Sequence, residues 1–497
     1  MQTAGRFFNE QFELSIYALA IFIALSFWFL AIKAPLWLDE TASYWGISGG
    51  VGQIWNRSIH LDSFPAYFYV LWLTKTLLGG KEIVLRLPSV LAMTASVYVF
   101  FRCAKELFAQ DVALIATVLF ILDSRIVFAA IDVRPYPFAM LFANLAIFTF
   151  LRWLKTNKIS AAALCGVATA SVFYFHYLFG ACIVAAFAVA YVANRWRSFL
   201  ADLGQLGVAV GCFTVFIAPL APRLWILFRV RNASVFAGPP TFALFLRSLG
   251  PGVVPFVFVA VVFVAALIRK LATPDEESIR RLTVSAALAL VPTVLLYSLS
   301  IATPLHIFID RYLVVAVPGI ALFWAWIFSL IDSRTLRVLG CAAIVTCTAY
   351  VYYTSPMART HGYSWKSALE FADANAVQDG APLILCSDFP NADFEEMPSG
   401  PPSDSELFAP LSYYPVRTTV IPMPRALNGQ AQAIGRRFFL RAALNHERFL
   451  AACFAPSYPT LNWLVQLTSA THTFHVLGYF DGIAVVEFDP RSTPDGY

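Results

Sequence analysis

Apolar stretches of roughly 20 residues recur along the first 355 positions of the chain, and they constrain its fold more than any other feature. Residues 14–33 form the first, and Leu14 to Ile32 contain no charged side chain. Such a stretch crosses a hydrocarbon core of about 30 Å at about 1.5 Å per residue. We therefore expect a polytopic α-helical membrane protein with about 11 transmembrane helices. The expected spans are 14–33, 86–107, 112–131, 135–154, 160–178, 180–196, 205–222, 253–269, 282–301, 312–331 and 338–355.

Composition supports the membrane class. Hydrophobic residues make up 59% of the chain and charged residues 13%, whereas about a quarter of a soluble domain is charged. The net charge of +5 is modest. It comes from Lys and Arg between the spans, so it indicates topology and not binding to nucleic acid.

The loop charges predict an orientation. Every short loop on one side is basic, and the positive-inside rule makes that side cytoplasmic. Arg6 places the N-terminus on the same side. An odd number of spans then places Asp39 and everything after Pro356 outside. We expect a multi-pass protein of the cell inner (plasma) membrane, with its C-terminal part periplasmic or extracytoplasmic. The basic loop residues include Arg102, Lys105, Arg152, Lys155, Lys158, Arg195, Arg197, Arg269, Lys270, Arg280, Arg281, Arg334 and Arg337.

Residues 34–85 form the first outer loop of the expected transmembrane module 1–355. Thr41 to Ile47 and Ala66 to Leu78 predict two short helices in the membrane interface, where their many Trp and Tyr rings are half buried. The second could instead span the membrane. That extra span would invert every later loop and break the charge asymmetry.

From Pro356 the composition changes, and no later stretch is apolar enough to span a membrane. Residues 356–497 predict a soluble α/β domain, because about 140 residues can bury a core. We expect helices at 365–374 and 434–454, a buried strand at 382–387, and a hairpin that turns at Asp481-Gly482. Cys386 and Cys453 could be bridged if this part faces an oxidising compartment.

Ionisable side chains gather at the outer ends of the expected spans. Charged groups at membrane depth are costly and suggest function. Arg is the natural bidentate partner of phosphate oxygens, and a carboxylate can accept the proton of an attacking hydroxyl. The sequence thus predicts a site that binds phosphate and moves a proton. The residues are Asp39, Glu40, His60, Asp62, Arg86, Asp123, Arg125, Asp132, Arg134, His176, His306, Asp310 and Arg311.

Several motifs occur in a recognisable order. They are LWLDE at 36–40, His60-x-Asp62-x-x-Pro65, LRLPSVL at 85–91, Asp132-Val-Arg134-Pro135-Tyr136, Tyr174-Phe-His176-Tyr177 and Asp310-Arg311-Tyr312-Leu. Their order and spacing over about residues 10–355 resemble the GT-C superfamily of integral-membrane glycosyltransferases. The nearest branch is the bacterial one related to protein O-mannosyltransferases and to the aminoarabinose transferase of lipid A.

The resemblance implies an inverting glycosyltransferase on the outer face of the membrane. Its donor would be a polyprenyl-phosphate-linked sugar, and its acceptor a hydroxyl of lipid A or lipopolysaccharide, a cell-surface glycan or a protein. Asp39 matches the catalytic base of the family, and Glu40 would hydrogen-bond to the acceptor or to neighbouring groups. Asp132 matches a second acidic position that is usually Glu.

The resemblance also implies residues that bind the donor. Arg134 and Arg311, with Tyr312, match positions near the lipid phosphate or the sugar. His60 and Asp62 match a motif that borders the catalytic loop, and His176 belongs to the same set. No cofactor or metal is expected, because the donor already has a good leaving group, although some GT-C relatives use a divalent metal.

Structural roles compete with these assignments. Asp39 could cap a helix that starts at Thr41, Asp62 could begin a helix with Pro65, and Arg311 could be an interfacial anchor. A transporter or flippase of lipid-linked glycans is the main alternative function, and a non-catalytic scaffold is another. Transporters usually have two related halves with sites near the midplane, whereas here the halves look unrelated.

Overall fold

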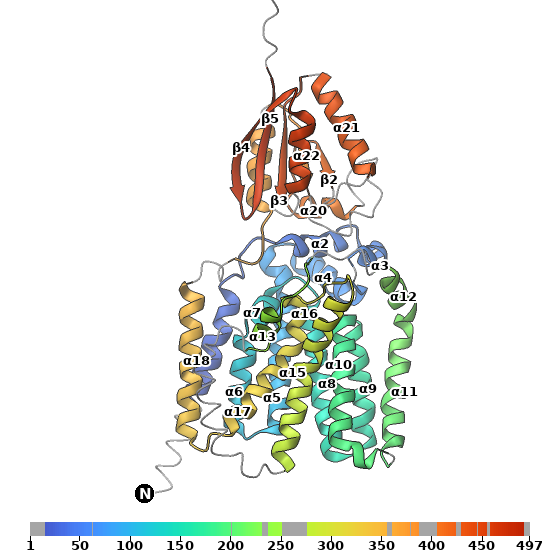
Figure 1. Cartoon of the computed structure of the whole chain (residues 1–497), viewed down its shortest axis with the longest axis vertical. Coiled ribbons are helices and arrows are strands. Elements are labelled where there is room, and N and C mark those ends of the chain that lie inside the picture. Colours follow the sequence, from blue (N-terminus) through green and yellow to red (C-terminus); the bar gives the residue numbers. More distant parts are fainter. Residues whose placement is uncertain are drawn as a thin grey trace, which may run out of the picture. The chain divides into compact units, whose positions relative to one another are not determined.

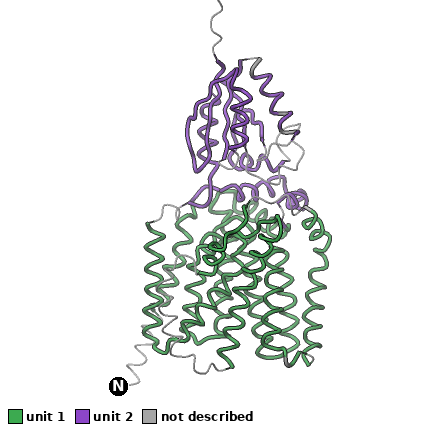
Figure 2. Tube along the Cα trace, in the orientation of Figure 1, with its two compact units in different colours: residues 1–33, 64–229, 237–359 green, residues 34–63, 230–236, 360–497 purple. Residues whose placement is uncertain are grey.

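A computed structural model describes residues 15–61, 63–199, 201–230, 237–250, 276–354, 360–377, 379–386, 405–423, 429–444, 446–454 and 458–491. The chain divides into two compact units, which Figure 2 distinguishes by colour. The helical unit comprises residues 1–33, 64–229 and 237–359. The mixed unit comprises residues 34–63, 230–236 and 360–497. The first outer loop expected from the sequence is thus divided between the two units.

The helical unit is a bundle, coloured blue to yellow in Figure 1. Seven of its described helices are long and apolar enough to cross a membrane. Two further apolar helices are shorter, Ser15–Phe29 and α9 (Ile159–Phe173). The expectation of a polytopic helical membrane protein is confirmed, and the expected span at 253–269 lies outside the described residues. The seven are α5 (Glu82–Leu107), α8 (Tyr136–Thr156), α10 (Tyr177–Arg195), Leu203–Arg229, α15 (Glu276–Ala302), Asp310–Ser329 and α18 (Arg334–Thr354).

Shorter elements complete the described part of this unit. Among them, the helix α4 corresponds to the second interfacial helix expected from the sequence. The other helices named here are α4 (Pro65–Leu78), α6 (Gln110–Leu122), α7 (Ser124–Ile131) and α13 (Phe242–Ser248). The span Leu203–Arg229 contains α11 (Leu203–Ile217) and most of α12 (Ala221–Val230), and the span Asp310–Ser329 contains α16 (Asp310–Leu313), η5 (Val314–Ala316) and α17 (Val317–Ser329).

Small residues bring the helices of the bundle close together. A Cβ added to Gly319 of α17 would lie 2.1 Å from the carbonyl carbon of Leu288 in α15. A Cβ added to Gly166 of α9 would lie 2.2 Å from the carbonyl oxygen of Ala209 in α11. Helices in lipid gain their association energy from such close contact, because lipid supplies no hydrophobic driving force between them.

The expected span 112–131 is broken where Asp123 interrupts it. The helices α6 and α7 meet there at 65°. Asp123 ends the first helix and caps the second, because its Oδ1 accepts the N–H of Arg125 at 3.0 Å. The same carboxylate pairs with the buried guanidinium of Arg125 at 2.6 Å. Arg125 also donates to the carbonyl oxygen of Ser248, at the end of α13, at 2.9 Å.

The mixed unit contains a five-stranded sheet, coloured orange to red in Figure 1. The strand order is β2-β1-β3-β5-β4. The first three of these are parallel, and β5 is antiparallel to both β3 and β4. The expectation of a C-terminal α/β domain is confirmed. The strands are β1 (Leu383–Cys386), β2 (Val420–Met423), β3 (Phe449–Phe454), β4 (His472–Phe480) and β5 (Ile483–Pro490).

The helices and turns of this unit agree with the sequence in most places. The expected hairpin is present, with Asp481 at φ 49° and Gly482 at φ 83°, which are the positive values of a type I′ turn. The expected helix at 365–374 is observed as α19. We call residues 360–497 the tail. Its described α-helices are α19 (Lys366–Ala376), α20 (Ala409–Tyr413), α21 (Gly429–Leu444) and α22 (Tyr458–Thr468).

The helix expected at 434–454 is wrong over its second half. The helix α21 ends at Leu444, and residues 449–454 form the strand β3, whose residues are all buried. A short apolar run fits a buried helix and a buried strand equally well by periodicity. Arg448 precedes this strand and pairs with Glu487, and with Asp379 at 2.8 Å. Its side chain is therefore held by these two carboxylates.

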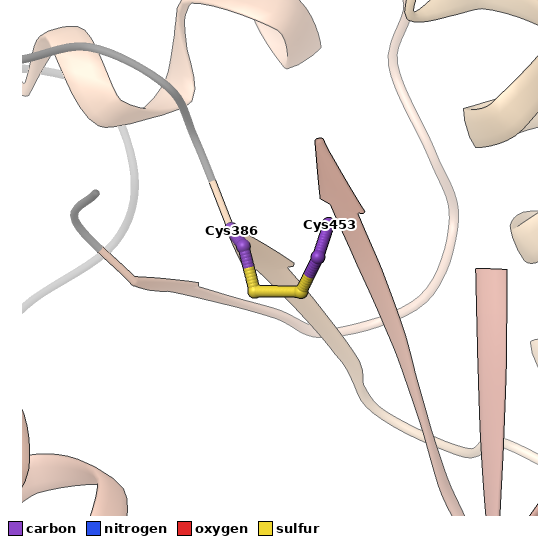
Figure 3. Close-up of a disulfide and its surroundings, with 2 residues drawn as sticks. All are labelled: Cys386 and Cys453. Carbon is purple, nitrogen blue, oxygen red and sulfur yellow. A yellow bond between two sulfur atoms is a disulfide. The ribbon is translucent and has the colours of Figure 1, made fainter. Parts of the chain in front are cut away.

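Cys386 and Cys453 form a disulfide, which Figure 3 shows between two neighbouring strands. They occupy paired positions of the parallel strands β1 and β3. Their Cα atoms are 4.5 Å apart, within the range that a disulfide requires. The bridge links residues separated by 67 positions.

Residues 34–63 pack with the tail inside the mixed unit. They contain α2 (Leu38–Ser48) and α3 (Val51–His60). The first was expected as a helix at 41–47, and the second was not expected. The ring of Tyr44 on α2 meets that of Tyr413 on α20 edge to face, with centroids 4.8 Å apart.

Candidate active site

The two acids of the LWLDE motif occupy the first turn of α2. The N-cap of this helix is Trp37, so Asp39 is not the cap of a helix that begins at Thr41. Asp39 is half-buried, whereas Glu40 is fully buried. Both carboxylates are favourably placed relative to the positive end of the helix dipole.

Glu40 fixes the start of the helix. Its Oε2 accepts the backbone N–H of Trp37 at 3.2 Å, which satisfies a donor that the helix itself leaves free. Its Oε1 lies 3.5 Å from Nε2 of His361, and both side chains are buried. Sequence motifs did not single out His361. The signal available was the His-Gly pair at 361–362, which follows directly on the last span.

Helix α3 packs beside this segment. Arg57 donates to the carbonyl oxygen of Trp45 at 2.7 Å, and its guanidinium carbon lies 4.8 Å from the centroid of the Trp45 ring. His60 is exposed at the end of α3, and its ring meets Trp45 edge to face with centroids 6.3 Å apart. Asp62 lies outside the described residues.

A second group of predicted residues comes together in the helical unit. We call Arg134, Tyr136, His176, Arg311 and Tyr312 the arginine–histidine cluster. The ring centroid of His176 lies 5.4 Å from that of Tyr136 and 5.5 Å from that of Tyr312. The guanidinium carbon of Arg134 is 6.0 Å from the centre of the Tyr136 ring, and that of Arg311 is 5.6 Å from the centre of the Tyr312 ring.

Three separate parts of the chain supply this cluster. Arg134 precedes α8, His176 is the N-cap of α10, and Arg311 lies on α16. The side chains of all three are partly accessible. Two guanidinium groups beside one imidazole make an electropositive position suited to a phosphate.

His176 lies in the link between α9 and α10. Its Nδ1 accepts the backbone N–H of Phe179 at 3.4 Å. An imidazole nitrogen that accepts a hydrogen bond carries no proton, so the proton of the neutral ring is on Nε2 and can be donated.

The remaining predicted acid belongs to the same unit. Asp132 is fully buried at the end of α7, and its carbonyl oxygen accepts the hydroxyl of Ser89 at 2.6 Å. Arg86, one turn before Ser89 on α5, is also fully buried and donates to the carbonyl oxygen of Ile32 at 2.8 Å. His306 has a local contact, with Nδ1 3.2 Å from the carbonyl oxygen of Ser300.

Comparison with known proteins identifies the fold. Residues 62–221 match the family described as dolichyl-phosphate-mannose-protein mannosyltransferase. A search of curated protein sequences gave no match. The crystal structure of ArnT from Cupriavidus metallidurans bound to undecaprenyl phosphate aligns with 95% of this chain and 97% of its own, at 12% identity and a TM-score of 0.56.

Two other solved structures align less closely. One is the oligosaccharyltransferase AglB from Archaeoglobus fulgidus, with a TM-score of 0.46, 12% identity, and coverage of 96% of this chain and 74% of that one. The other is the arabinofuranosyltransferase AftD from Mycobacteria, with a TM-score of 0.49, 15% identity, and coverage of 97% and 42%. Residues 62–221 are thus similar to that mannosyltransferase family, and the chain shares the fold of the ArnT structure.

Proposed function

We propose that this protein transfers a sugar from a polyprenyl-phosphate-linked donor to a hydroxyl of an envelope acceptor, with inversion at the anomeric carbon. The observation that carries the proposal is the gathering of Arg134, Arg311 and His176 around the rings of Tyr136 and Tyr312. The ArnT structure with the same fold was solved with undecaprenyl phosphate, which supports a lipid phosphate as the ligand here.

The arginine–histidine cluster would hold the donor phosphate. When the sugar leaves, the bond between the anomeric carbon and the phosphate oxygen breaks, and its electron pair stays on that oxygen. The phosphodiester becomes a phosphomonoester with additional negative charge. Arg134 and Arg311 stabilise this charge more in the transition state than in the ground state. The Nε2–H of His176 can donate a further hydrogen bond to the phosphate or to the sugar.

Asp39 is the proposed general base. It would accept the proton of the acceptor hydroxyl while that oxygen forms the new bond to the anomeric carbon. Asp39 is partly accessible, as a base must be, whereas Glu40 is buried and already accepts the N–H of Trp37. Asp132 is proposed as a second acidic group of the site, and His60, Asp62 and Tyr312 as residues that border it.

The chemistry of this reaction does not require a metal, since phosphate is a good leaving group and the two arginines supply the balancing charge. We propose that transfer proceeds without a divalent cation. Glu40 and His361 are side chains of the kinds that bind one, with Oε1 and Nε2 3.5 Å apart. Activity that survives EDTA supports the metal-free reaction, and activity lost in EDTA and restored by a divalent ion contradicts it.

The compartment follows from the charge asymmetry of the loops. We propose that the chain resides in the cell inner membrane, with its N-terminus cytoplasmic and residues 356–497 on the outer side. Cysteine accessibility to an impermeant reagent tests this, with reporters placed at the exposed positions His475 and Arg102. Labelling of the first alone in intact cells or spheroplasts is expected, and labelling of the second alone would reverse the orientation.

Reconstitution tests the proposed reaction. Purified protein in liposomes is incubated with a panel of labelled polyprenyl-phosphate sugars and with envelope fractions that supply lipid, glycan and protein acceptors. We expect label to move to one acceptor class, and Asp39→Asn to abolish the transfer while Asp481→Asn, at an exposed turn, preserves it. Transfer by the Asp39→Asn variant would overturn the role of Asp39. Movement of lipid-linked sugar across the bilayer without transfer would favour a flippase.

A further inference from the structure

The first residues of the tail lie along Trp37, the N-cap of the helix that carries Asp39. Ser364 pairs with Trp37 in an antiparallel backbone bridge. Gly362 has φ +71°, and a Cβ added to it would lie 2.7 Å from the Cβ of Trp37. Both observations demand glycine at this position, because only glycine adopts a positive φ freely and lets the backbone approach so closely.

His361 reaches the acid that follows Asp39. Its Nε2 is 3.5 Å from Oε1 of Glu40, with side-chain exposures of 1% and 0%. A buried carboxylate is costly unless its oxygens have partners. The other oxygen, Oε2, is committed to the N–H of Trp37. The imidazole of His361 therefore faces the second carboxylate oxygen of Glu40 at the first turn of α2.

The segment is anchored to the sheet as well. The ring of Tyr363 packs on that of Phe454, the last residue of β3, with centroids 4.7 Å apart. Trp365, which follows, is buried at the start of α19. Residues 361–365 thus connect the folded core of the tail to residues 37–40.

We propose that His361 is a positioning residue for Asp39, acting through Glu40, and that the tail is by this route a working part of the active site. The proposal rests on the proposed role of Asp39 as base. Asp39 and Glu40 are consecutive residues of one helical turn, so a displacement of Glu40 displaces Asp39. A shift of about 1 Å in a catalytic group can lower a rate by about 100-fold.

The kinetic test uses His361→Ala, His361→Gln and the matched control His475→Ala, an exposed histidine on β4. We expect His361→Ala to lower kcat by about 10- to 100-fold without changing KM for the donor lipid. His361→Gln should recover part of the loss, because its amide can still face Glu40. The double variant Glu40→Gln/His361→Ala should be no slower than the slower single variant, since both act through one contact. A wild-type kcat in His361→Ala, or additive losses in the double variant, overturns the proposal.

A structural test is independent of catalysis. Amide hydrogen exchange is measured for peptides that cover residues 36–41 and, as a reference, α19 and β3. His361→Ala and Gly362→Ala should each accelerate exchange at 36–41 and leave the reference peptides unchanged. Unchanged exchange at 36–41, or equal acceleration everywhere, overturns the positioning role. If wild-type protein transfers no sugar, the proposed function fails, and the exchange experiment still decides whether His361 holds this segment.

Discussion

The backbone N–H of Leu36 donates to the hydroxyl of Tyr414 at 2.7 Å, although 378 positions separate the two residues. Both residues are buried. The bond links the residue two positions before α2 to the residue that follows α20. Leu36 is three residues before Asp39. Water cannot readily replace the hydroxyl at a buried position.

Replacing Tyr414 with Phe should loosen this entry. The ring remains, but the buried N–H of Leu36 loses its acceptor, at a cost of about 1–3 kcal/mol. Hydrogen exchange at Leu36 and its neighbours should accelerate, while Tyr479→Phe, whose side chain is exposed, should have no effect. Equal protection in Tyr414→Phe and wild type would contradict the importance of this bond.

Neutralising either arginine of the cluster should weaken donor use. A hydrogen bond to a charged group contributes about 1.5–3 kcal/mol, so Arg134→Gln and Arg311→Gln should each reduce kcat/KM for the donor by about 10- to 150-fold. Arg102→Gln, which removes an exposed charge near the C-terminal end of α5, serves as the control. Steady-state kinetics with varied donor lipid measures the effect, and wild-type values in both variants would exclude the cluster as the phosphate site.

Removing one partner of the buried pair at the α6–α7 break should destabilise the helical unit. Asp123→Asn leaves the guanidinium of Arg125 without its counter-charge, a change that costs about 3–5 kcal/mol when a buried pair is broken. The apparent Tm of the purified protein in detergent should fall. The exposed Asp332→Asn should leave it unchanged, and equal melting of both variants would show that Asp123 is dispensable.

The disulfide should stabilise the tail chiefly through the length of the loop that it closes. Its cysteines are 67 positions apart, for which chain entropy gives about 4 kcal/mol. Cys386→Ser or Cys453→Ser should therefore lower the denaturant midpoint of the tail, whereas Cys347→Ser, at an exposed position outside any disulfide, should not. Reductant should shift the midpoints of wild type and of Cys347→Ser but not those of Cys386→Ser and Cys453→Ser, and insensitivity of the wild type to reductant would mean that the bridge is absent in solution.

Acid should loosen the contact between α19 and residues 417–418, which precede the strand β2. Burial raises the pKa of Asp373, but hydrogen bonds from the backbone and side chain of Arg417 and from the N–H of Thr418 outweigh it and leave the pKa below its usual value. A depressed folded-state pKa gives stability that is complete above the unfolded value of about 3.9 and is lost as the pH falls below it. Exchange at residues 417–419 should accelerate below about pH 4. Asp373→Asn should already show fast exchange at pH 7 and a smaller response to acid.

Local patterns predicted much of this protein. The membrane spans could be predicted because each has the length and the low polarity that a bilayer requires. The hairpin at Asp481-Gly482 could be predicted because its turn needs two residues with positive φ. The run 449–454 was misassigned, since a fully buried strand has no alternation that distinguishes it from a buried helix. Three of the sequence motifs each supply one residue of the arginine–histidine cluster, namely Arg134, His176 and Arg311.

The association of residues 34–63 with the tail could not be predicted. It depends on single contacts between distant positions, such as Tyr44 with Tyr413 and Glu40 with His361. Neither contact has a periodic or compositional signature. In the sequence, Asp39 and Glu40 are simply two adjacent acids. Their burial in the structure distinguishes them, because Asp39 is partly accessible whereas Glu40 is buried and organises the start of its helix.

The mixed unit is assembled from both ends of the chain, and this sets the order in which the protein matures. Leu36 is synthesised 378 positions before Tyr414, which is on the order of 20–75 seconds at ordinary elongation rates. During that interval the segment with Asp39 lacks the residues that hold it. A chain truncated before Tyr414 therefore has residues 36–44 without the later residues that contact them.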